Sequence, residues 1–428
     1  GGVSSAVAIA ASKRAKERGL LYFGTLTYSN DTTGKDGHRY MFRECNNAWM
    51  SAQVLGQYLN KTLPNKRYFY VTADYTWGHT SESSLRQATG TVDTSKHQGV
   101  RTAFPDARLS DYRAALEKAA NSGAEVLVLV LFGEDMVRAM RIADELGLNK
   151  KMQIAVPNLT LSMVELAGPD IMRGVLGTEP WTWRVPELEG SERGKAFVRN
   201  FGERYQTHPS SSAASAYSIV YQWADAVSRA KTIASEPVIA ALENHSYSLL
   251  KGQQQWRAFD HQNVQTVYAV RVKPREEVLK DRFKQDYFEI VDRLDASSAL
   301  PSLADWQAER RAGGQQAAEQ CIVEVLHAGE VDLVEAVADD HQLALAVHLD
   351  QPRKDAGVAG AGDVKHLAGT GRQMQRSMPR AQQGHAMLAT SHQQRAEFER
   401  RFHERLSAIV QRELKLGAEQ TQQLVQAT

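Results

Sequence analysis

An unbroken apolar run between Glu125 and Phe132 (Val-Leu-Val-Leu-Val-Leu) constrains the fold of this chain more than any other stretch. Valine alternates with leucine in this run, which favours a strand, and such a strand has no polar face to turn toward water. It therefore requires a sheet that is covered on both faces, as parallel α/β sheets are. Gly133-Glu134-Asp135 ends the run, and Met136 to Leu146 has a helical pattern that stops at Gly147. This stretch predicts a strand, a loop and a helix in succession.

A second unit of the same kind begins at Tyr68. Tyr68 to Val71 is a short β-branched and aromatic run that predicts a buried strand. Asp74 to Gly78 is a polar and aromatic loop, and Thr80 or Ser81 can cap a helix that continues through Leu85. The chain therefore repeats its strand–loop–helix plan.

Further strands are predicted by short apolar runs along the first three hundred residues. Their order with the helical patterns is β-α-β-α in units of roughly 30 residues, which is typical of a doubly wound parallel sheet in an α/β fold. The predicted strands are Leu20 to Phe23, Val100 to Phe104, Met152 to Val156, Gly174 to Thr178 and Tyr287 to Val291, with Trp256 to Phe259 and Thr266 to Val272 expected to form a β-ribbon.

The loops that follow such strands lie at the carboxyl edge of the sheet, where ligands bind in this class of fold. Tyr75 and Trp77, in the loop after Val71, are therefore candidate ring faces for a small molecule. The alternative is that both rings only plug the top of the sheet. Trp181 and Trp183 leave the same choice open between core packing and a lid over the ligand.

The composition is that of an ordinary globular chain and excludes several classes of function. The formal net charge is +1, with 42% hydrophobic and 24% charged residues, which favours neither nucleic acid nor an anionic membrane as a partner. The two cysteines, Cys45 and Cys321, are too few for a disulfide framework and lack zinc-site spacing. Each is expected to be a buried small hydrophobe, and no metal or cofactor is expected.

The 428 residues exceed what one such sheet uses, so we expect two lobes. The first lobe is predicted to span residues 1–104 and the second 105–230, with the helix from Ser215 to Ala230 returning toward the first lobe. Residues 231–310 would supply the remaining hinge-crossing and ribbon segments. Residues 311–428 lack clear periodicity over much of their length, which predicts a tail of low order. Its terminal helix is expected at Arg395 to Leu416.

The amino terminus enters a helical pattern almost at once. Gly1-Gly2-Val3-Ser4-Ser5 opens into Ala6 to Arg18 with neither an initiator Met nor a signal peptide. Because a turn of this kind usually lies inside a βα unit, we expect further chain, with at least one strand, before Gly1.

Five segments in register with the predicted βα pattern resemble a known family. They are Gly1 to Ala8, Thr25 to Asn30, Ala73 to Thr80, Leu129 to Gly133 and Val156 to Thr160. In these segments the chain is similar to the type I periplasmic solute-binding proteins of ABC importers, most of all to the branch that binds branched-chain amino acids, amides or urea. The resemblance covers roughly residues 1–310 and implies two Rossmann-like lobes with parallel sheets joined by a three-segment hinge, the first lobe being incomplete here.

The resemblance also implies a ligand site, carried over position by position. Ser4 and Ser5 match the loop whose serine and backbone NH groups hold a ligand carboxylate, a role that suits a helix start. Thr27 or Ser29 matches a hydroxyl of the next loop. Trp77, with Tyr75 beside it, matches an aromatic that covers the ligand. The loop that closes from the second lobe is matched by Phe132, Gly133 and Asp135.

One position departs from the family pattern. Where binders of amino acids often carry an acid for the ligand's ammonium group, this chain has Asn158. That difference favours a neutral or amide-like ligand over a zwitterionic amino acid. The alternative is that Asp135 or Asp74 supplies the acid instead.

The function that these features predict is reversible capture without chemistry. The chain would be the periplasmic, monomeric substrate-binding component of an ABC importer, holding a small polar solute and docking on a membrane permease. The alternative function is a ligand-sensing regulator or receptor domain of the same fold. An enzyme is disfavoured because the histidines are scattered and no Gly-x-Ser-x-Gly, His-Glu-x-x-His or Gly-x-x-x-x-Gly-Lys spacing occurs.

Overall fold

The computed structural model describes residues 1–295, 298 and 300–314, all of which belong to the first of two compact units, Gly1–Glu330. Cys321, the helix expected at Arg395 to Leu416 and nearly all of the predicted tail lie outside the described residues. No helix in the described part of the chain is long and apolar enough to cross a bilayer.

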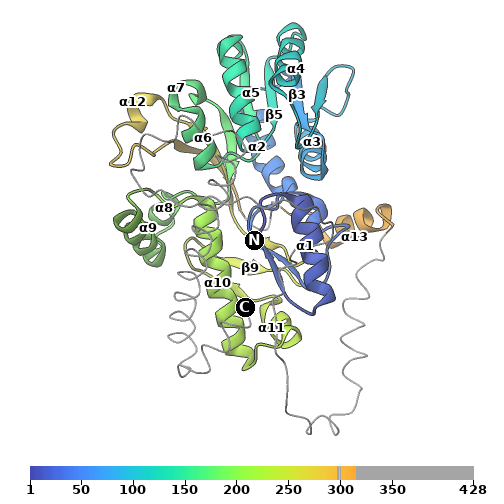
Figure 1. The fold of residues 1–428 in the computed structure, drawn as a ribbon, viewed down its shortest axis with the longest axis vertical. Coiled ribbons are helices and arrows are strands. Elements are labelled where there is room, and N and C mark those ends of the chain that lie inside the picture. Colours follow the sequence, from blue (N-terminus) through green and yellow to red (C-terminus); the bar gives the residue numbers. More distant parts are fainter. Residues whose placement is uncertain (296–297, 299, 315–428) are drawn as a thin grey trace, which may run out of the picture. The chain divides into compact units, whose positions relative to one another are not determined.

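A seven-stranded mixed sheet, called the large sheet below, is the main element of the structure. Five strands in its order β4-β3-β5-β6-β7 are parallel, and β11 and β12 extend it antiparallel beyond β7. Figure 1 shows α4 and α5 beside β3 and β5. The strands are β3 (Tyr68–Ala73), β4 (Gly99–Thr102), β5 (Val126–Val130), β6 (Gln153–Val156), β7 (Leu176–Glu179), β11 (Val267–Val272) and β12 (Phe288–Leu294).

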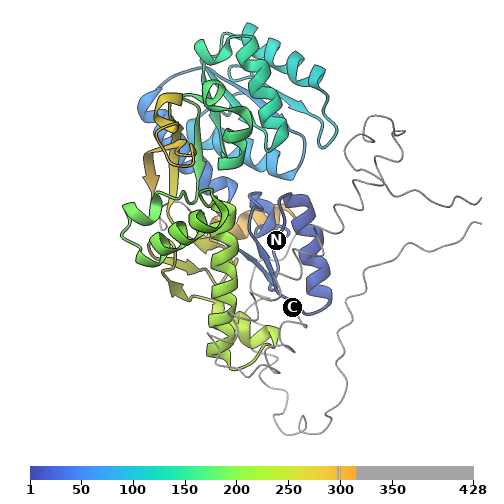
Figure 2. The ribbon, with the colours of Figure 1, turned by 60° about the vertical axis from the view of Figure 1, so that its left-hand side comes forward.

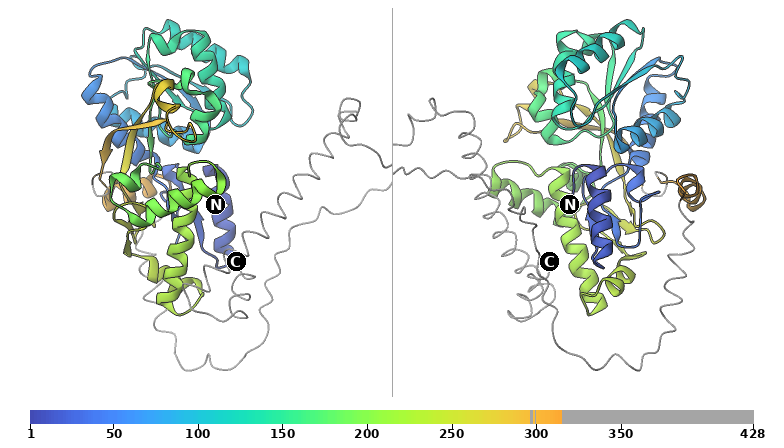
Figure 3. Two further views of the ribbon diagram at one scale, coloured as in Figure 1. Left: turned by 90° about the vertical axis from the view of Figure 1, so that its left-hand side faces the viewer. Right: turned by 45° about the vertical axis from the view of Figure 1, so that its right-hand side comes forward.

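Helices cover both faces of the large sheet, as the apolar run of β5 requires (Figure 3). On one face, Val128 and Tyr70 pack in a core with Leu55 and Trp77 from α2 and α3. Because side chains alternate along a strand, Leu127 points to the other face, where α4, α5 and α6 pack. These helices are α2 (Ala48–Thr62), α3 (Thr76–Thr89), α4 (Leu109–Asn121), α5 (Glu134–Glu145) and α6 (Leu161–Ala167).

The other elements gather around two small sheets. A parallel pair, β1 and β2, lies near the amino terminus, and an antiparallel sheet has the order β10-β9-β8. Phe42 joins the two, with its ring 5.6 Å from Trp256 and stacked on His261 at 3.9 Å. In Figure 2 the N-terminal segment lies beside α10 and α11. The elements are α1 (Ser5–Glu17), β1 (Tyr22–Gly24), η1 (Asn30–Thr32), β2 (Met41–Arg43), α9 (Glu192–Tyr205), α10 (Ser211–Ala230), α11 (Ser235–Leu242), β8 (Ser246–Tyr247), β9 (Gln254–Trp256) and β10 (Asn263–Val264).

Short helices complete the described chain. Among them, α13 carries a capping box between Ser302 and Asp305, and its Trp306 is buried and donates from Nε1 to the carbonyl of Thr33 at 2.8 Å. The remaining helices are η2 (Leu148–Lys150), α7 (Pro169–Met172), α8 (Val185–Leu188), α12 (Arg275–Val278) and α13 (Leu303–Ala312).

The strand pairing differs from the sequence-based expectation in two places. The boundary expected at residue 104 does not divide the strands, because β3 and β4 share the large sheet with β5, β6 and β7. The expected β-ribbon is wrong as well, since β9 belongs to the small antiparallel sheet whereas β11 pairs with β7 and β12. A strand's own residues show that it is buried but not which strand lies next to it, so the pattern alone cannot assign a parallel partner.

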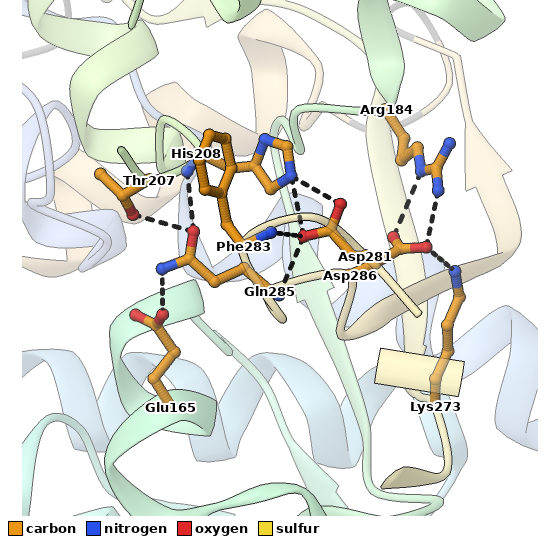
Figure 4. Close-up of polar contacts among 9 residues, drawn as sticks. All are labelled: Glu165, Arg184, Thr207, His208, Lys273, Asp281, Phe283, Gln285 and Asp286. Atoms are coloured by element: carbon orange, nitrogen blue, oxygen red, sulfur yellow. Dashed lines mark hydrogen bonds and ion pairs between the residues drawn. The ribbon is translucent and has the colours of Figure 1, made fainter. Parts of the chain in front are cut away.

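A polar network ties the loop before α10 to the segment that precedes β12 (Figure 4). His208 Nε2 lies 3.0 Å from both carboxylate oxygens of Asp281, and the His208 backbone NH donates to Gln285 Oε1 at 2.7 Å. Nearby, Asp286 accepts from Arg184 Nη2 and from Lys273 Nζ, each at 2.7 Å. The network therefore joins the α9–α10 connection to the edge of the large sheet.

The two carboxylates of this network are held in the charged form. Burial acts to raise the pKa of Asp286, but the hydrogen bonds from Arg184 and Lys273 outweigh it and leave that pKa below its ordinary value. Burial is likewise the largest influence on Asp281, where the hydrogen bond with His208 prevails and lowers the pKa. A lowered folded-state pKa stabilises the fold above the ordinary carboxyl range, and this contribution is lost as the pH falls through the folded-state pKa.

Replacing Asp286 by Asn tests this network. At pH 7 we expect Asp286→Asn to lower the free energy of unfolding by about 1–3 kcal/mol, because hydrogen bonds to a charged group are lost. The difference in the free energy of unfolding between this variant and the unmutated chain should shrink as the pH falls below about 3.8, where the carboxyl of the unfolded chain becomes protonated. Urea unfolding at several pH values measures both effects.

Asp170→Asn is the matched control for this experiment. Asp170 pairs with Arg275 at 2.9 Å, and the two side chains are 69% and 54% exposed. Such a surface pair contributes about 0–1 kcal/mol, so the control should change stability little at any pH. A difference for Asp286→Asn that stays constant from pH 7 to pH 3 would contradict the role assigned to this carboxylate.

Candidate functional site

The loop that follows β1 is shaped by a fully buried arginine. Arg43, the last residue of β2, donates from Nη1 to the carbonyl of Thr27 at 3.0 Å and to the carbonyl of Ser29. Its Nη2 donates to Thr33 Oγ1 and its Nε to Gln262 Oε1, both at 2.6 Å. A planar guanidinium with several donors suits such a set of acceptors. Arg43 therefore holds the backbone of the two residues predicted to present a hydroxyl.

Arg43 keeps its charge although water does not reach it. Burial lowers the pKa of Arg43 to about 10, and the negative groups around it, Asp260 among them, act in the opposite direction. At neutral pH the guanidinium is therefore protonated, and the loop is organised around a buried cation.

Ser29 lies in a network of hydroxyl groups between this loop and the start of α3. Its Oγ accepts from the Asp31 backbone NH at 3.2 Å and from Thr80 Oγ1 at 3.2 Å, and it lies 2.9 Å from Thr76 Oγ1. Thr76 in turn donates to Asp31 Oδ2 at 2.5 Å. The Ser29 hydroxyl is thus engaged with protein groups and joins η1 to α3.

The predicted serines at the chain start lie at the first turn of α1. Ser4 is the N-cap residue, and its side chain makes no capping bond. Ser5 is 2% exposed, and its Oγ accepts from the Ser29 backbone NH at 3.1 Å. The structure therefore brings the helix start beside the loop that carries Thr27 and Ser29. Thr27 itself is completely buried.

Trp77, Phe132 and Asn158 come together at the carboxyl ends of neighbouring strands. Trp77 is 1% exposed, and its Nε1 donates to Asn158 Oδ1 at 3.2 Å. Its ring meets Phe132 edge-on at 5.9 Å, and Phe132 lies 6.0 Å from the ring of Tyr28. Asn158 Nδ2 donates to Ser51 Oγ at 3.1 Å. The strand ends thus carry a connected aromatic and amide cluster that includes Tyr28 of the N-terminal segment.

A glycine permits the close turn that positions Trp77. A Cβ at Gly78 would lie 1.9 Å from the carbonyl oxygen of Ala73, so α3 can begin this near to the end of β3 only with glycine at that position. The buried indole belongs to the core cluster between α2, α3 and the sheet. It therefore packs the sheet edge as well as lying at the predicted site.

The other predicted residues lie around this cluster. Tyr75 is partly buried, with its ring 6.0 Å from Trp77, but its stacking partner is Phe104 at 4.0 Å. Gly133 is the N-cap residue of α5 and has a φ of +62°, a conformation that favours glycine. Asp135, in the first turn of α5, lies 3.7 Å from Arg138.

Asp74, the other acid considered from the sequence, is exposed. It lies 2.7 Å from His79 Nε2 and 3.7 Å from Arg101. It is already engaged at the surface by the imidazole of His79 and the guanidinium of Arg101, which makes it a poor match for a ligand's ammonium group. Within the described part of the chain, no group of three or more His, Cys, Asp and Glu side chains is arranged to hold a metal ion.

The sequence-based reasoning missed two buried ionisable side chains next to this cluster. Glu179 ends β7 and is 2% exposed, and Lys251, from the connection between β8 and β9, is 5% exposed. Lys251 Nζ donates to the carbonyl of Pro180 at 2.7 Å and to Gln265 Oε1. The signal was present for Glu179, because a carboxylate at the end of a completely buried strand is unusual. Lys251 carries no comparable signal.

Burial dominates the protonation of both groups. It raises the pKa of Glu179 well above the ordinary value, against the opposing influence of the Ser211 hydroxyl and the Lys251 charge. It lowers the pKa of Lys251 to about 8, although Glu44, Glu189 and Glu179 act to raise it. Tyr28 is buried near Glu179, and burial together with that carboxyl raises its pKa. Glu179, at the end of β7, and Tyr28, in the loop after β1, are therefore close enough to influence each other.

Comparison with known proteins places the chain in a family. The model of the periplasmic binding protein family matches residues 1–277, so the chain belongs to that family. This confirms the resemblance stated from the sequence, and the family is one of binding proteins rather than enzymes. No match was found among curated protein sequences.

Solved structures of ABC transporter binding proteins share the fold. An amino acid ABC transporter substrate-binding protein from Pseudomonas fluorescens matches with a TM-score of 0.62 and 21% identity over 72% of this chain and 79% of that one. The leucine-, isoleucine-, valine-, threonine- and alanine-binding protein of Brucella ovis, in a closed conformation, matches with a TM-score of 0.57 and 19% identity. The match covers 70% of this chain and 77% of that one. A Rhodopseudomonas palustris solute-binding protein in complex with 3,4-dihydroxybenzoic acid matches with a TM-score of 0.57 and 16% identity. The match covers 68% of this chain and 77% of that one.

Arg43→Lys tests the role of the buried guanidinium. A lysine keeps the charge but cannot satisfy all four acceptors in one plane, so we expect the free energy of unfolding to fall by about 1–3 kcal/mol. Urea unfolding measures the change. Arg293→Lys is the control, because Arg293 is 55% exposed and lies 3.9 Å from Asp295, and it should shift stability by less than about 0.5 kcal/mol. Equal stability of Arg43→Lys and the unmutated chain would contradict the assignment.

Proposed function

We propose that this chain is the substrate-binding component of an ABC importer, which captures a small polar solute and delivers it to a membrane permease. The solute is an amino acid or a related amide or urea-like compound, and the protein acts in the periplasm as a monomer. The observation that carries the proposal is the cluster at the carboxyl ends of the large sheet, where ligands bind in folds of this kind. There Trp77, Phe132 and Asn158 meet Tyr28 from a different group of elements.

The two groups of elements are the proposed lobes. One contains the large sheet and its helices, and the other contains the N-terminal segment, α9 to α11 and the small antiparallel sheet. The chain passes between them at residues 44–47, 180–184 and 265–266, and it returns once more between β12 and α13, whose Trp306 donates to the carbonyl of Thr33. We assign the hinge to the first three of these segments, which are short, as in folds that close around a ligand. This division replaces the one expected from the sequence.

The proposed mechanism is closure on the solute. The rings of Tyr28, Trp77 and Phe132 offer apolar faces, and the start of α1 near Ser5 offers backbone NH groups to an anionic end. A solute that contacts both lobes binds the closed form more tightly than the open one and so shifts the population toward it. The permease then distinguishes the closed form, and no covalent step is needed.

A thermal-shift panel tests whether the chain captures a solute. The panel contains the common L-amino acids, short amides, urea and small aliphatic and aromatic carboxylates. A ligand that binds only the native state stabilises it by about 2.7 kcal/mol at 100 times its dissociation constant, so one chemical class should raise the melting temperature. A cooperative melt that no member of the panel shifts would contradict the proposed function.

Changes at Trp77 test where the solute binds. We expect Trp77→Ala to weaken binding more than ten-fold, which corresponds to about 1.4 kcal/mol. Because the indole is buried, this variant should also lose about 3–5 kcal/mol of stability, so binding is measured by calorimetry well below its melting temperature. Trp77→Phe retains a ring but loses the bond to Asn158, and it should weaken binding by a smaller factor.

Trp256→Phe is the matched control for these variants. Trp256 is also fully buried and donates from Nε1, to Gln222 Oε1 at 3.1 Å, but it belongs to the small antiparallel sheet. It should alter stability without altering affinity. Unchanged affinity in both Trp77 variants would remove Trp77 from the site.

A further inference from the structure

A buried carboxylate oxygen without a partner lies at the carboxyl edge of the large sheet. Glu179 is the last residue of β7, where it pairs in register with Tyr268 of β11. Its side chain is buried, yet Oε2 has no hydrogen-bond partner among the residues that the structure describes. Leaving such an oxygen unsatisfied destabilises the fold, and more so when the carboxyl is charged. A group that is absent from the free chain can recover this cost.

The surroundings of Glu179 are polar but do not neutralise it. No Lys, Arg or His side chain in the described residues forms an ion pair with Glu179, and Lys251 donates instead to Pro180 and Gln265. Three buried hydroxyls in nearby segments also have no hydrogen-bond partner among the described residues, those of Thr182, three residues farther along the chain, and of Ser211 and Ser215 in α10. Ser211 is close to Glu179, and Ser215 lies one helical turn beyond Ser211. Acceptor atoms thus remain available after β7 and at the start of α10.

Glu179 adjoins the cluster proposed to bind the solute. The Leu159 backbone NH donates to the carbonyl of Thr178 at 3.1 Å, which places the Asn158 loop beside the end of β7. Tyr28, whose ring lies 6.0 Å from that of Phe132, is close enough to Glu179 for that carboxyl to raise the pKa of Tyr28. The unsatisfied oxygen is therefore part of the same region and not a separate pocket.

The alternative acids are already occupied. Asp74 is exposed and close to His79 and Arg101, and Asp135 is near Arg138. The amide of Asn158 is also engaged, because its oxygen accepts from Trp77 and its nitrogen donates to Ser51. Glu179 differs from these residues in having a buried carboxylate oxygen, Oε2, that no described residue engages.

We propose that Glu179 is the specificity-determining acid of the solute site and receives the protonated amine of the ligand. This rests on the function proposed above and deepens it, since it assigns the solute to the compounds that carry an ammonium group, such as amino acids. An ammonium group has three donors, which match the free Glu179 oxygen and the hydroxyl acceptors beside it. The acid supplied from the end of β7 replaces the one that the chain lacks at Asn158, and it reverses the preference for a neutral ligand expected from the sequence.

Calorimetry with matched pairs of solutes tests the proposal. The first member is the L-amino acid that gives the largest thermal shift in the panel, and the second is the same compound without its amine, for example 4-methylpentanoate for L-leucine. The unmutated chain should bind the amino acid at least ten-fold more tightly than the deaminated acid. This comparison needs no variant and so does not depend on how a substitution folds.

Glu179→Gln identifies the residue responsible. The substitution keeps the shape of the side chain and removes its charge, and we expect at least a ten-fold loss of affinity for the amino acid with less than a two-fold change for the deaminated acid. Glu165→Gln is the control, because Glu165 is also a carboxyl with a pKa raised by burial but contacts Gln285 away from this region. It should leave both affinities unchanged.

The outcomes separate this proposal from the proposed function. If a solute without an amine binds the unmutated chain as tightly as its amino-acid partner, or if Glu179→Gln binds the amino acid normally, the role of Glu179 is overturned while solute capture stands. If the folded chain binds none of the panel, both the proposed function and this inference fail.

Discussion

The burial of β5 on both faces is the constraint on which the rest of this structure depends. A strand made of valine and leucine has no side to expose to water, so helices must cover the sheet above and below. Helix-covered parallel strands all end at the same edge, and their loops must therefore meet there. Trp77 after β3, Phe132 after β5, Asn158 after β6 and Glu179 at the end of β7 are neighbours for that reason. The position of the candidate site follows from the packing of the sheet.

The other side of the site depends on buried charges rather than on apolar packing. Arg43 holds the loop of Thr27 and Ser29 through backbone carbonyls, and Lys251 is anchored to Pro180. Buried cations are retained only when their protons find acceptors, and both of these do. Glu179 differs because one of its carboxylate oxygens, Oε2, accepts no hydrogen bond from any described residue. In the role proposed for Glu179, the solute supplies the missing donor.

The local pattern of apolar residues predicted the strands and several residues that meet at their carboxyl ends. It did not predict which distant segments pair with one another. The strands at Tyr68 and Val126 and the edge that joins Trp77, Phe132 and Asn158 could be predicted, because they depend on periodicity and on a general rule about parallel sheets. The boundary expected at residue 104 does not follow the observed strand pairing, because sheet order is not encoded in any one strand. β2 was not among the predicted strands, since three residues are too short for a clear alternation.

The role of Arg43 was missed for a related physical reason. A single arginine in a short apolar segment does not reveal which carbonyl groups the fold will bring to it. For Glu179, by contrast, a carboxylate that ends a short buried strand was a visible anomaly, and only its environment was unknown. The family resemblance, confirmed by the match over residues 1–277, implied positions for the site loops and placed the family's acid at position 158, where this chain has asparagine.

The central claim, that the solute binds at the strand ends beside Trp77, can be tested directly by two-dimensional NMR of the indole NH groups. The chain has seven tryptophans, and Trp77→Phe and Trp256→Phe identify the signals of these two. On titration with the solute that stabilises the chain, the Trp77 signal should shift and saturate with the calorimetric dissociation constant, whereas the Trp256 signal should remain in place. A saturating shift at Trp256 with none at Trp77 would show that the solute binds elsewhere and would contradict the account.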